Sequence, residues 1–245
     1  MFLKSFMEII MGKQVKDNLV RYEQKFAIKD SFNASFIKNY IEFGDFGFKK
    51  AFENRQVNSI YYDYPNFDLL KQNIEGSSKR LKIRTRFYGK NNLFDKLFLE
   101  FKRKSGFSGW KNIFLLDGNS SEKYKFSDIY TLALNSNIPF EFLIPLIGLK
   151  PKILVSYKRM YYISFCKKYR ITFDYDIEYK SLYGFEYISE IGETSMKSQR
   201  NIIELKYNKL DHEGSFEIIK NIPLRVSKNS KYVEGLYLTG LITQY

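Results

Sequence analysis

The stretch Lys79–Tyr88, KRLKIRTRFY, decides the predicted fold, because cationic and uncharged side chains alternate along it. Successive side chains of a β-strand point to opposite faces, so an alternation with period two predicts a strand. Its polar face holds Arg80, Lys82, Arg84 and Arg86. Same-face neighbours lie about 6.6 Å apart along a strand, and like charges at that distance repel unless solvent or an anion relieves them. The stretch therefore predicts a strand with one strongly basic face.

The same alternation recurs at residues 20–28, 96–104 and 168–178. The polar faces of these stretches mix cations with carboxylates, namely Lys25, Lys102, Lys104, Arg170, Glu23, Glu100 and Asp174. Further strands are predicted at residues 56–62, 110–116, 152–164, 184–189 and 201–207. Helical spacing predicts helices at residues 31–43, 66–74, 127–135, 139–147 and 231–239. Together these patterns predict an α+β fold of eight or nine strands with helices packed outside.

The composition narrows the classes of function. The chain of 245 residues carries 40 Lys and Arg against 27 Asp and Glu, a net charge of +13. Such a surplus suits nucleic acid, a membrane surface or a phosphate-rich small molecule. The chain has one cysteine and one histidine, Cys166 and His212, which excludes multi-cysteine zinc sites and histidine metal clusters. We expect Cys166 to be structural or incidental and His212 to lie on a surface loop.

The distribution of apolar residues along the chain predicts the cellular compartment and the number of domains. No run of 18 apolar residues occurs, so we expect no integral membrane segment and a cytoplasmic protein. Residues 1–17 are predicted to be an N-terminal extension or short helix, which precedes a single domain over residues 18–245.

The basic faces have two interpretations. Each could be a solvated surface, but an antiparallel sheet closed into a barrel would point all of them at one lumen. Arginine gives bidentate contacts to phosphate oxygens and lysine supplies a point charge, while carboxylates suit Mg²⁺ or Mn²⁺. Nucleic acid would explain the charge but not the carboxylates at strand spacing, and no aromatic RNA-binding motif occurs. We therefore expect an anionic phosphate ligand with a divalent metal, and no nucleic acid.

Several motifs resemble one family. Residues 84–89, RTRFYG, resemble the R-x-R-x-Y-G strand of the VTC (vacuolar transporter chaperone) polyphosphate polymerase domain, which belongs to the CYTH-like triphosphate tunnel metalloenzyme superfamily. Further segments resemble other motifs of that domain, in its order: 21–26 RYEQKF, 59–63 SIYYD, 99–102 LEFK, 156–159 SYKR, 170–174 RITFD, 204–206 ELK and 230–232 SKY. The resemblance implies a closed antiparallel tunnel of eight strands.

The resemblance also implies a function and its residues. A metal-dependent polymerase would transfer the γ-phosphate of ATP to a growing polyphosphate chain inside the tunnel and release ADP. The catalytic residues would be Lys25, Arg84, Arg86, Lys102, Arg159 and Lys231. The further phosphate-binding residues would be Lys82, Lys104, Lys111, Arg170, Lys206 and Ser230. Glu204 would hold Mn²⁺ or Mg²⁺, and Glu23, Glu100 and Asp174 would either help it or hold the cations in place as ion-pair partners.

One departure separates the branches of that superfamily. Arg21 stands at the first acidic position of the E-x-E-x-K signature of tunnel hydrolases and cyclases, which favours the polymerase branch. The alternatives are a tunnel triphosphatase that hydrolyses inorganic or nucleoside triphosphate, and a non-catalytic polyphosphate-binding module. The chain resembles a free-standing bacterial form, although a membrane partner protein could bind it. Tyr88 and Tyr232 are candidates for contact with a nucleotide base.

Overall fold

One antiparallel sheet runs through the computed structural model, which describes residues 21–29, 34–44, 47–89, 94–106, 108–117, 124–222 and 224–243. The predicted N-terminal extension lies outside these residues. The strands are β1 (Arg21–Lys29), β2 (Phe48–Asp63), β3 (Lys79–Tyr88), β4 (Leu97–Ser105), β5 (Ser108–Leu116), β6 (Lys150–Ser164), β7 (Arg170–Ser181), β8 (Met196–Lys197) and β9 (Arg200–Asn208).

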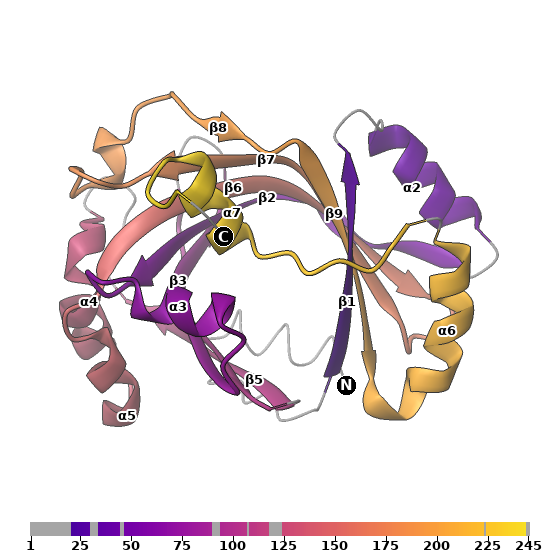
Figure 1. The fold of residues 1–245 in the computed structure, drawn as a ribbon, viewed down its shortest axis with the longest axis horizontal. Coiled ribbons are helices and arrows are strands. Elements are labelled where there is room, and N and C mark those ends of the chain that lie inside the picture. The colour runs from indigo at the N-terminus through magenta and orange to yellow at the C-terminus, as the bar shows by residue number, and fades with distance from the viewer. Residues whose placement is uncertain are drawn as a thin grey trace.

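The strand order makes a curved sheet with two ends. The hydrogen-bonded path runs β1-β9-β7-β6-β2-β3-β4-β5, and β8 pairs with β7. Among the described residues no ladder joins β5 back to β1. The two ends nevertheless meet, because Lys102 Nζ of β4 lies 3.2 Å from Glu23 Oε2 of β1. The fold is therefore the predicted antiparallel tunnel (Figure 1). A contact between side chains, instead of a ladder of hydrogen bonds, joins its two ends.

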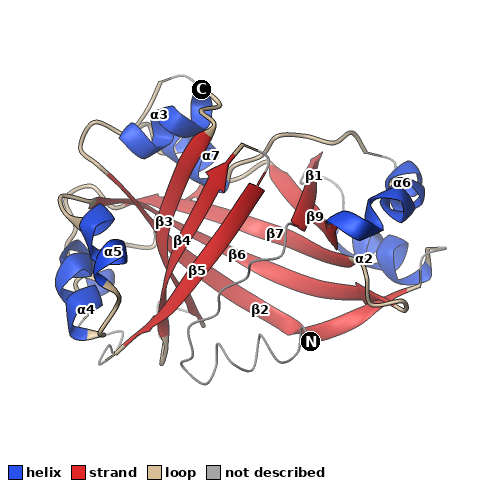
Figure 2. Cartoon of the chain, turned by 90° about the horizontal axis from the view of Figure 1, so that it is seen from below, coloured by secondary structure: helices blue, strands red, loops and turns tan. Residues whose placement is uncertain are grey.

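The helices are α2 (Ala34–Phe43), α3 (Asp68–Ile74), α4 (Ile129–Asn135), α5 (Phe140–Leu143), α6 (His212–Asn221) and α7 (Lys231–Leu238). Figure 2 shows α4 and α5 at one end of the sheet and α2 and α6 at the other. Their apolar side chains pack on the outer face, for example Phe142 against Phe101 and Ile218 in the core that contains Phe26. Burial of these apolar faces outside leaves the opposite face of the strands to polar residues.

Helix α7 packs on that opposite face. The Tyr232 ring stacks on Tyr61 of β2 with 5.3 Å between centroids, and Tyr179 of β7 donates to Glu234. Residues 224–230, here called the strap, lead to α7 from the β1 side (Figure 1). The strap bonds to β1, since Ser227 N donates to Lys25 O at 2.8 Å. Helix α7 thus packs its apolar side chains on the apolar part of this face, with Tyr232, Val233 and Leu236 in one cluster with Tyr61 and Tyr179.

The structure corrects three local predictions. Residues 184–189 form no strand but a turn and the 3-10 helix Ile188–Glu190, because the Glu190 carboxylate accepts from the backbone N–H groups of Glu186 and Tyr187. Strand β2 begins at Phe48, well before the predicted residue 56. His212 begins α6 instead of lying in a loop, and its ring stacks on Tyr22 at 5.0 Å.

Candidate functional site

The basic residues collect on one face of the sheet, here called the inner face. Residues directly opposite each other in an antiparallel ladder share a face. Lys82 of β3 pairs with Lys102 of β4, which pairs with Lys111 of β5. One step along, Arg84 pairs with Glu100. Three strands therefore present a continuous basic surface.

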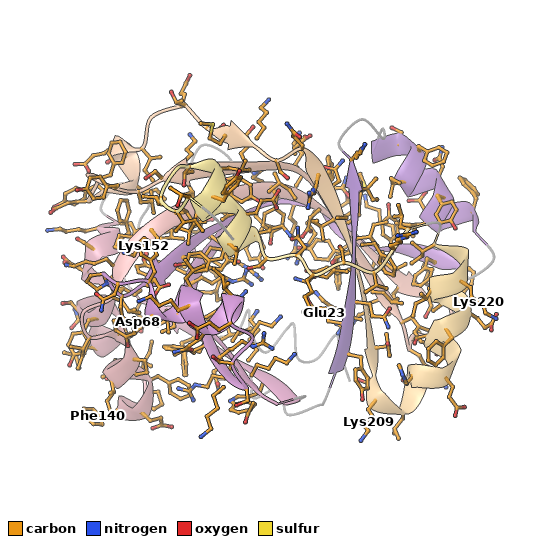
Figure 3. The ribbon with its side chains drawn as sticks, in the orientation of Figure 1. Glu23, Asp68, Phe140, Lys152, Lys209 and Lys220 are labelled. Carbon is orange, nitrogen blue, oxygen red and sulfur yellow. The ribbon has the colours of Figure 1, made fainter. Side chains whose placement is uncertain are left out.

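The other half of the tunnel wall continues this surface. Lys25 of β1 pairs with Glu204 of β9, which pairs with Thr172 of β7. A second row joins Glu23, Lys206 and Arg170 across the same strands. Figure 3 shows Glu23 on the side of β1 that faces the middle of the molecule. Because Glu23 contacts Lys102 across the seam, both halves line one interior.

Glu100 organises the cations of β3 and β5. Its carboxylate accepts from Arg84 Nε and Lys111 Nζ, each at 2.7 Å, and lies 3.2 Å from Arg86 Nη1. Burial alone would raise the pKa of Glu100, but Arg84 and Lys111 lower it to about 2. A carboxylate held ionised between three cations fixes their positions and leaves the group with a positive surplus. This geometry fits the ion-pair interpretation of Glu100 better than a metal-binding one.

Glu204 and Glu23 form a second network with the lysines of β1 and β9. Glu204 lies 2.7 Å from Lys206 Nζ and 3.2 Å from Lys25 Nζ, and Lys25 Nζ is also 3.3 Å from Glu23. Burial raises the pKa of Glu204, yet Lys206 and Lys25 hold it well below its usual range. Burial would likewise lower the pKa of Lys25, which Glu204 and Glu23 raise instead. Glu204 and Lys25 therefore stay charged at neutral pH.

Asp174 forms the third network and joins β6 to α7. Its carboxylate accepts from both Arg159 Nη2 at 2.7 Å and Lys231 Nζ at 2.6 Å. The Asp174 side chain has no exposed surface, and burial would raise its pKa, but Arg159 and Lys231 lower it. Arg159 also approaches Glu204 at 3.9 Å, which connects this network to the second one.

Lys82 differs from the other inner-face cations. Its Nζ donates to Ser230 Oγ at 2.9 Å, and within the described residues it forms no ion pair. Burial and the charges of Lys25 and Lys102 lower the pKa of Lys82 to about 7. Ser230 is the N-cap residue of α7, so the strap holds the acceptor in place. An anion bound beside the Lys82 ammonium would raise its pKa again and keep the group positively charged.

Two predicted phosphate-binding residues lie at the margin of the group. Lys104 pairs with Arg80 near the end of β4, where its side chain is exposed. Arg170 begins β7 opposite Lys206 and is half-buried. Both lie on the expected face of the sheet.

The sequence left several contributors unassigned. Tyr61 accepts from Arg84 Nη1 at 2.9 Å, and the carbonyl of Asn229 in the strap accepts from Lys25 Nζ at 3.2 Å. Ser59 Oγ and Arg86 Nε are buried without a hydrogen-bond partner in the described protein. Such orphaned polar atoms on a basic face suit a polar ligand. The alternation of Ser59 with Tyr61 could have indicated their common face, whereas nothing local marks Asn229.

A metal site would need help from the ligand. The described residues contain no cluster of three or more His, Cys, Asp or Glu that could hold a metal ion. The Lys25 ammonium lies between the carboxylates of Glu204 and Glu23. The inner face therefore offers a metal ion single carboxylates as ligands instead of a cluster. Mg²⁺ is commonly bound by one or two carboxylates together with substrate phosphates. The donor set therefore fits a divalent ion whose remaining ligands come from phosphate oxygens.

No helix in the described part of the chain is long and apolar enough to span a bilayer.

Comparisons with known proteins agree on the architecture. The family model for the VTC domain matches residues 20–239. HpAC1 of Hippeastrum, a protein classed as an adenylyl cyclase with a dominant triphosphatase activity, is 16% identical, with a TM-score of 0.51 over 89% of this chain and 95% of its own. A Bacillus halodurans protein classed as an adenylate cyclase is 14% identical, with a TM-score of 0.50 over 89% and 97%. No curated protein matches.

Proposed function

Because the chain belongs to the VTC domain family, we propose that it is a metal-dependent polyphosphate polymerase. In this proposal the γ-phosphoryl group of ATP passes to the end of a polyphosphate chain on the inner face, and ADP leaves. The triphosphate tunnel fold itself is shared with the solved structures described above.

One observation carries the proposal, which is the excess of cations over carboxylates on the inner face. The cations are Lys25, Lys82, Arg84, Arg86, Lys102, Lys111, Arg159, Lys206 and Lys231, and the carboxylates are Glu23, Glu100, Asp174 and Glu204. The carboxylates hold most of the cations in fixed positions and neutralise only part of their charge. A linear polyanion supplies the missing charge along the whole row.

The chemistry suits this set of groups. Phosphoryl transfer depends on positioning and on neutralisation of charge more than on a protein nucleophile. The attacking oxygen at a polyphosphate end is already ionised, so no strong general base is needed. Cysteine and histidine are the usual nucleophile and general base, and neither side chain belongs to the networks of the inner face. Cys166 is exposed in the turn between β6 and β7, and His212 packs on Tyr22 and Tyr207.

The proposed roles follow the networks. Lys25, Arg84, Arg86, Lys102, Arg159 and Lys231 would orient the reacting phosphates, with Lys82, Lys111, Arg170, Lys206 and Ser230 binding the rest of the chain and Lys104 meeting it at the margin. Tunnel enzymes of this kind generally use divalent ions, and Glu204 would hold Mn²⁺ or Mg²⁺, which would neutralise phosphate oxygens. Since ATP is the proposed donor, the cytoplasm is the proposed location of the reaction.

Product identity tests the proposal. The purified chain is incubated with ATP and Mn²⁺, and ADP, orthophosphate and polyphosphate are separated. ADP together with phosphate chains longer than triphosphate is expected. Orthophosphate as the sole phosphate product would instead identify a triphosphatase, and polyphosphate binding without turnover would identify a binding module; either result contradicts the proposal. Glu204→Gln should abolish turnover while the circular dichroism spectrum is unchanged.

A further inference from the structure

Four side chains on the tunnel wall form a group that the phosphate chemistry does not use. The Arg55 guanidinium lies 5.9 Å from the ring centroid of Phe52, 5.6 Å from that of Tyr88 and 5.9 Å from that of Tyr161. We call Phe52, Arg55, Tyr88 and Tyr161 the aromatic platform. All four side chains are half-buried, so each keeps part of its surface in contact with solvent.

An irregularity in β2 creates the platform. Phe52 pairs with Tyr161 and Arg55 pairs with Arg159, and the register shifts between these two pairs. In a regular strand, residues 52 and 55 would point to opposite faces because their separation is odd. The shift places both on the face of Arg159. Such bulges re-aim side chains and are common next to active sites.

The platform borders the proposed phosphate path. Arg55 lies opposite Arg159 in the ladder, and Tyr88 follows Arg86 by two residues on the same face, about 6.6 Å further along the strand. The Tyr88 hydroxyl also lies close enough to Glu100 to feel its charge, since burial and Glu100 together raise the pKa of Tyr88 to about 12. The aromatic rings are therefore continuous with the cations, at the end where β3 finishes.

We propose that the aromatic platform binds the base of the nucleoside triphosphate donor by stacking, while the triphosphate extends from it onto Arg86 and Arg159. The inference rests on the proposed function and adds a site for the part of the donor that is not phosphate. Aromatic rings and the planar guanidinium both offer π faces on which bases stack. Tyr232 does not belong to this site, since it is buried and donates to Asp63.

The test compares a ligand that has a base with one that lacks it. Affinities for ATP and for inorganic triphosphate are measured by calorimetry on the full chain, for the wild type and for Phe52→Leu, which keeps an apolar side chain but loses the ring. Base stacking on an aromatic side chain corresponds to about 1–3 kcal/mol. Phe52→Leu should therefore weaken ATP binding at least about fivefold more than it weakens inorganic triphosphate binding.

The matched control is Phe140→Leu, the same change on the exposed outer helix α5, seen at the edge of the molecule in Figure 3. It should change neither affinity. Tyr161→Leu provides an independent variant in case Phe52→Leu fails to fold, and it should show the same selective loss. Equal losses of affinity for ATP and inorganic triphosphate, or no loss of affinity for ATP, would overturn the proposal that the platform binds the base. A wild type that binds neither ligand would overturn the proposed function as well, whereas binding of triphosphate without selective loss overturns the platform alone.

Discussion

Lys82 shows what the binding face costs the folded protein. It is an inner-face cation without an ion pair among the described residues, and burial with the charges of Lys25 and Lys102 lowers its pKa to about 7. The unfolded chain binds this proton up to a pKa near 10.5. Stability is therefore penalised in full below pH 7, and the penalty disappears as the pH rises toward 10.5.

Lys82→Met should remove this stability penalty and should also weaken the binding of anions. At pH 6 the unfolding free energy of the variant should exceed that of the wild type by at least about 1.4 kcal/mol, the value of one pKa unit. By pH 10 the difference should be small. Urea denaturation at both pH values measures the stability, and calorimetry measures the affinity for inorganic triphosphate. A variant that is less stable at pH 6 and binds as well as the wild type would contradict this role.

Two neighbours on β6 provide a matched pair for the site. Arg159 points to the inner face and binds Asp174, whereas Lys158 is half-exposed and pairs with Asp176 at 2.7 Å. Arg159→Gln should lower the turnover of ATP by about 100-fold or more, the effect of losing one preorganised charge-stabilising donor. Lys158→Gln should stay within about twofold, because exposed ion pairs contribute little. Equal effects of the two changes on steady-state turnover would refute the inner-face assignment.

At the scale of elements, the regular parts of the fold could be predicted and the irregular parts could not. Strand β3 alternates strictly between cationic and uncharged side chains from Arg80 to Phe87, and its bounds agree with the sequence prediction. The register shifts in the pairing of β2 with β6 leave no local sequence signal, and the sequence prediction missed the residues of β2 before residue 56. Residues 184–189 alternate like a strand, but capping by Glu190 ends them as a 3-10 turn. Local hydrogen bonds prevailed there over periodicity.

Helix α7 depends on one close approach to the sheet. A Cβ atom on Gly235 would lie 2.5 Å from Tyr179 Cδ1 and 2.6 Å from Ile153 Cδ1. Alanine normally stabilises a helix interior relative to glycine, but here overpacking should dominate, and Gly235→Ala should lower the unfolding free energy by about 1–3 kcal/mol. Gly192→Ala is the control, because its added Cβ meets no atom within 4 Å. Urea denaturation that shows Gly235→Ala as stable as the wild type would mean that α7 does not sit this close.

At the scale of the whole molecule, the charge of +13 is explained in part by one interior surface. The faces of the individual strands could be predicted, because alternation alone assigns Lys25, Lys102 and Arg84 to polar faces. The second and third networks could not, since they combine segments far apart in the chain, such as Lys25 with Glu204 and Asp174 with Lys231. The contact of Lys102 with Glu23 across the seam is equally non-local.

The fate of the γ-phosphoryl group tests the central claim most directly. ATP labelled at the γ-phosphate is incubated with the full chain and Mn²⁺, and the label is followed by size separation. The polymerase account predicts that label accumulates in phosphate chains that lengthen with time, with ADP formed in equal amount, and that Arg84→Ala abolishes this. Label found only in orthophosphate, or only in unreacted ATP, would contradict it.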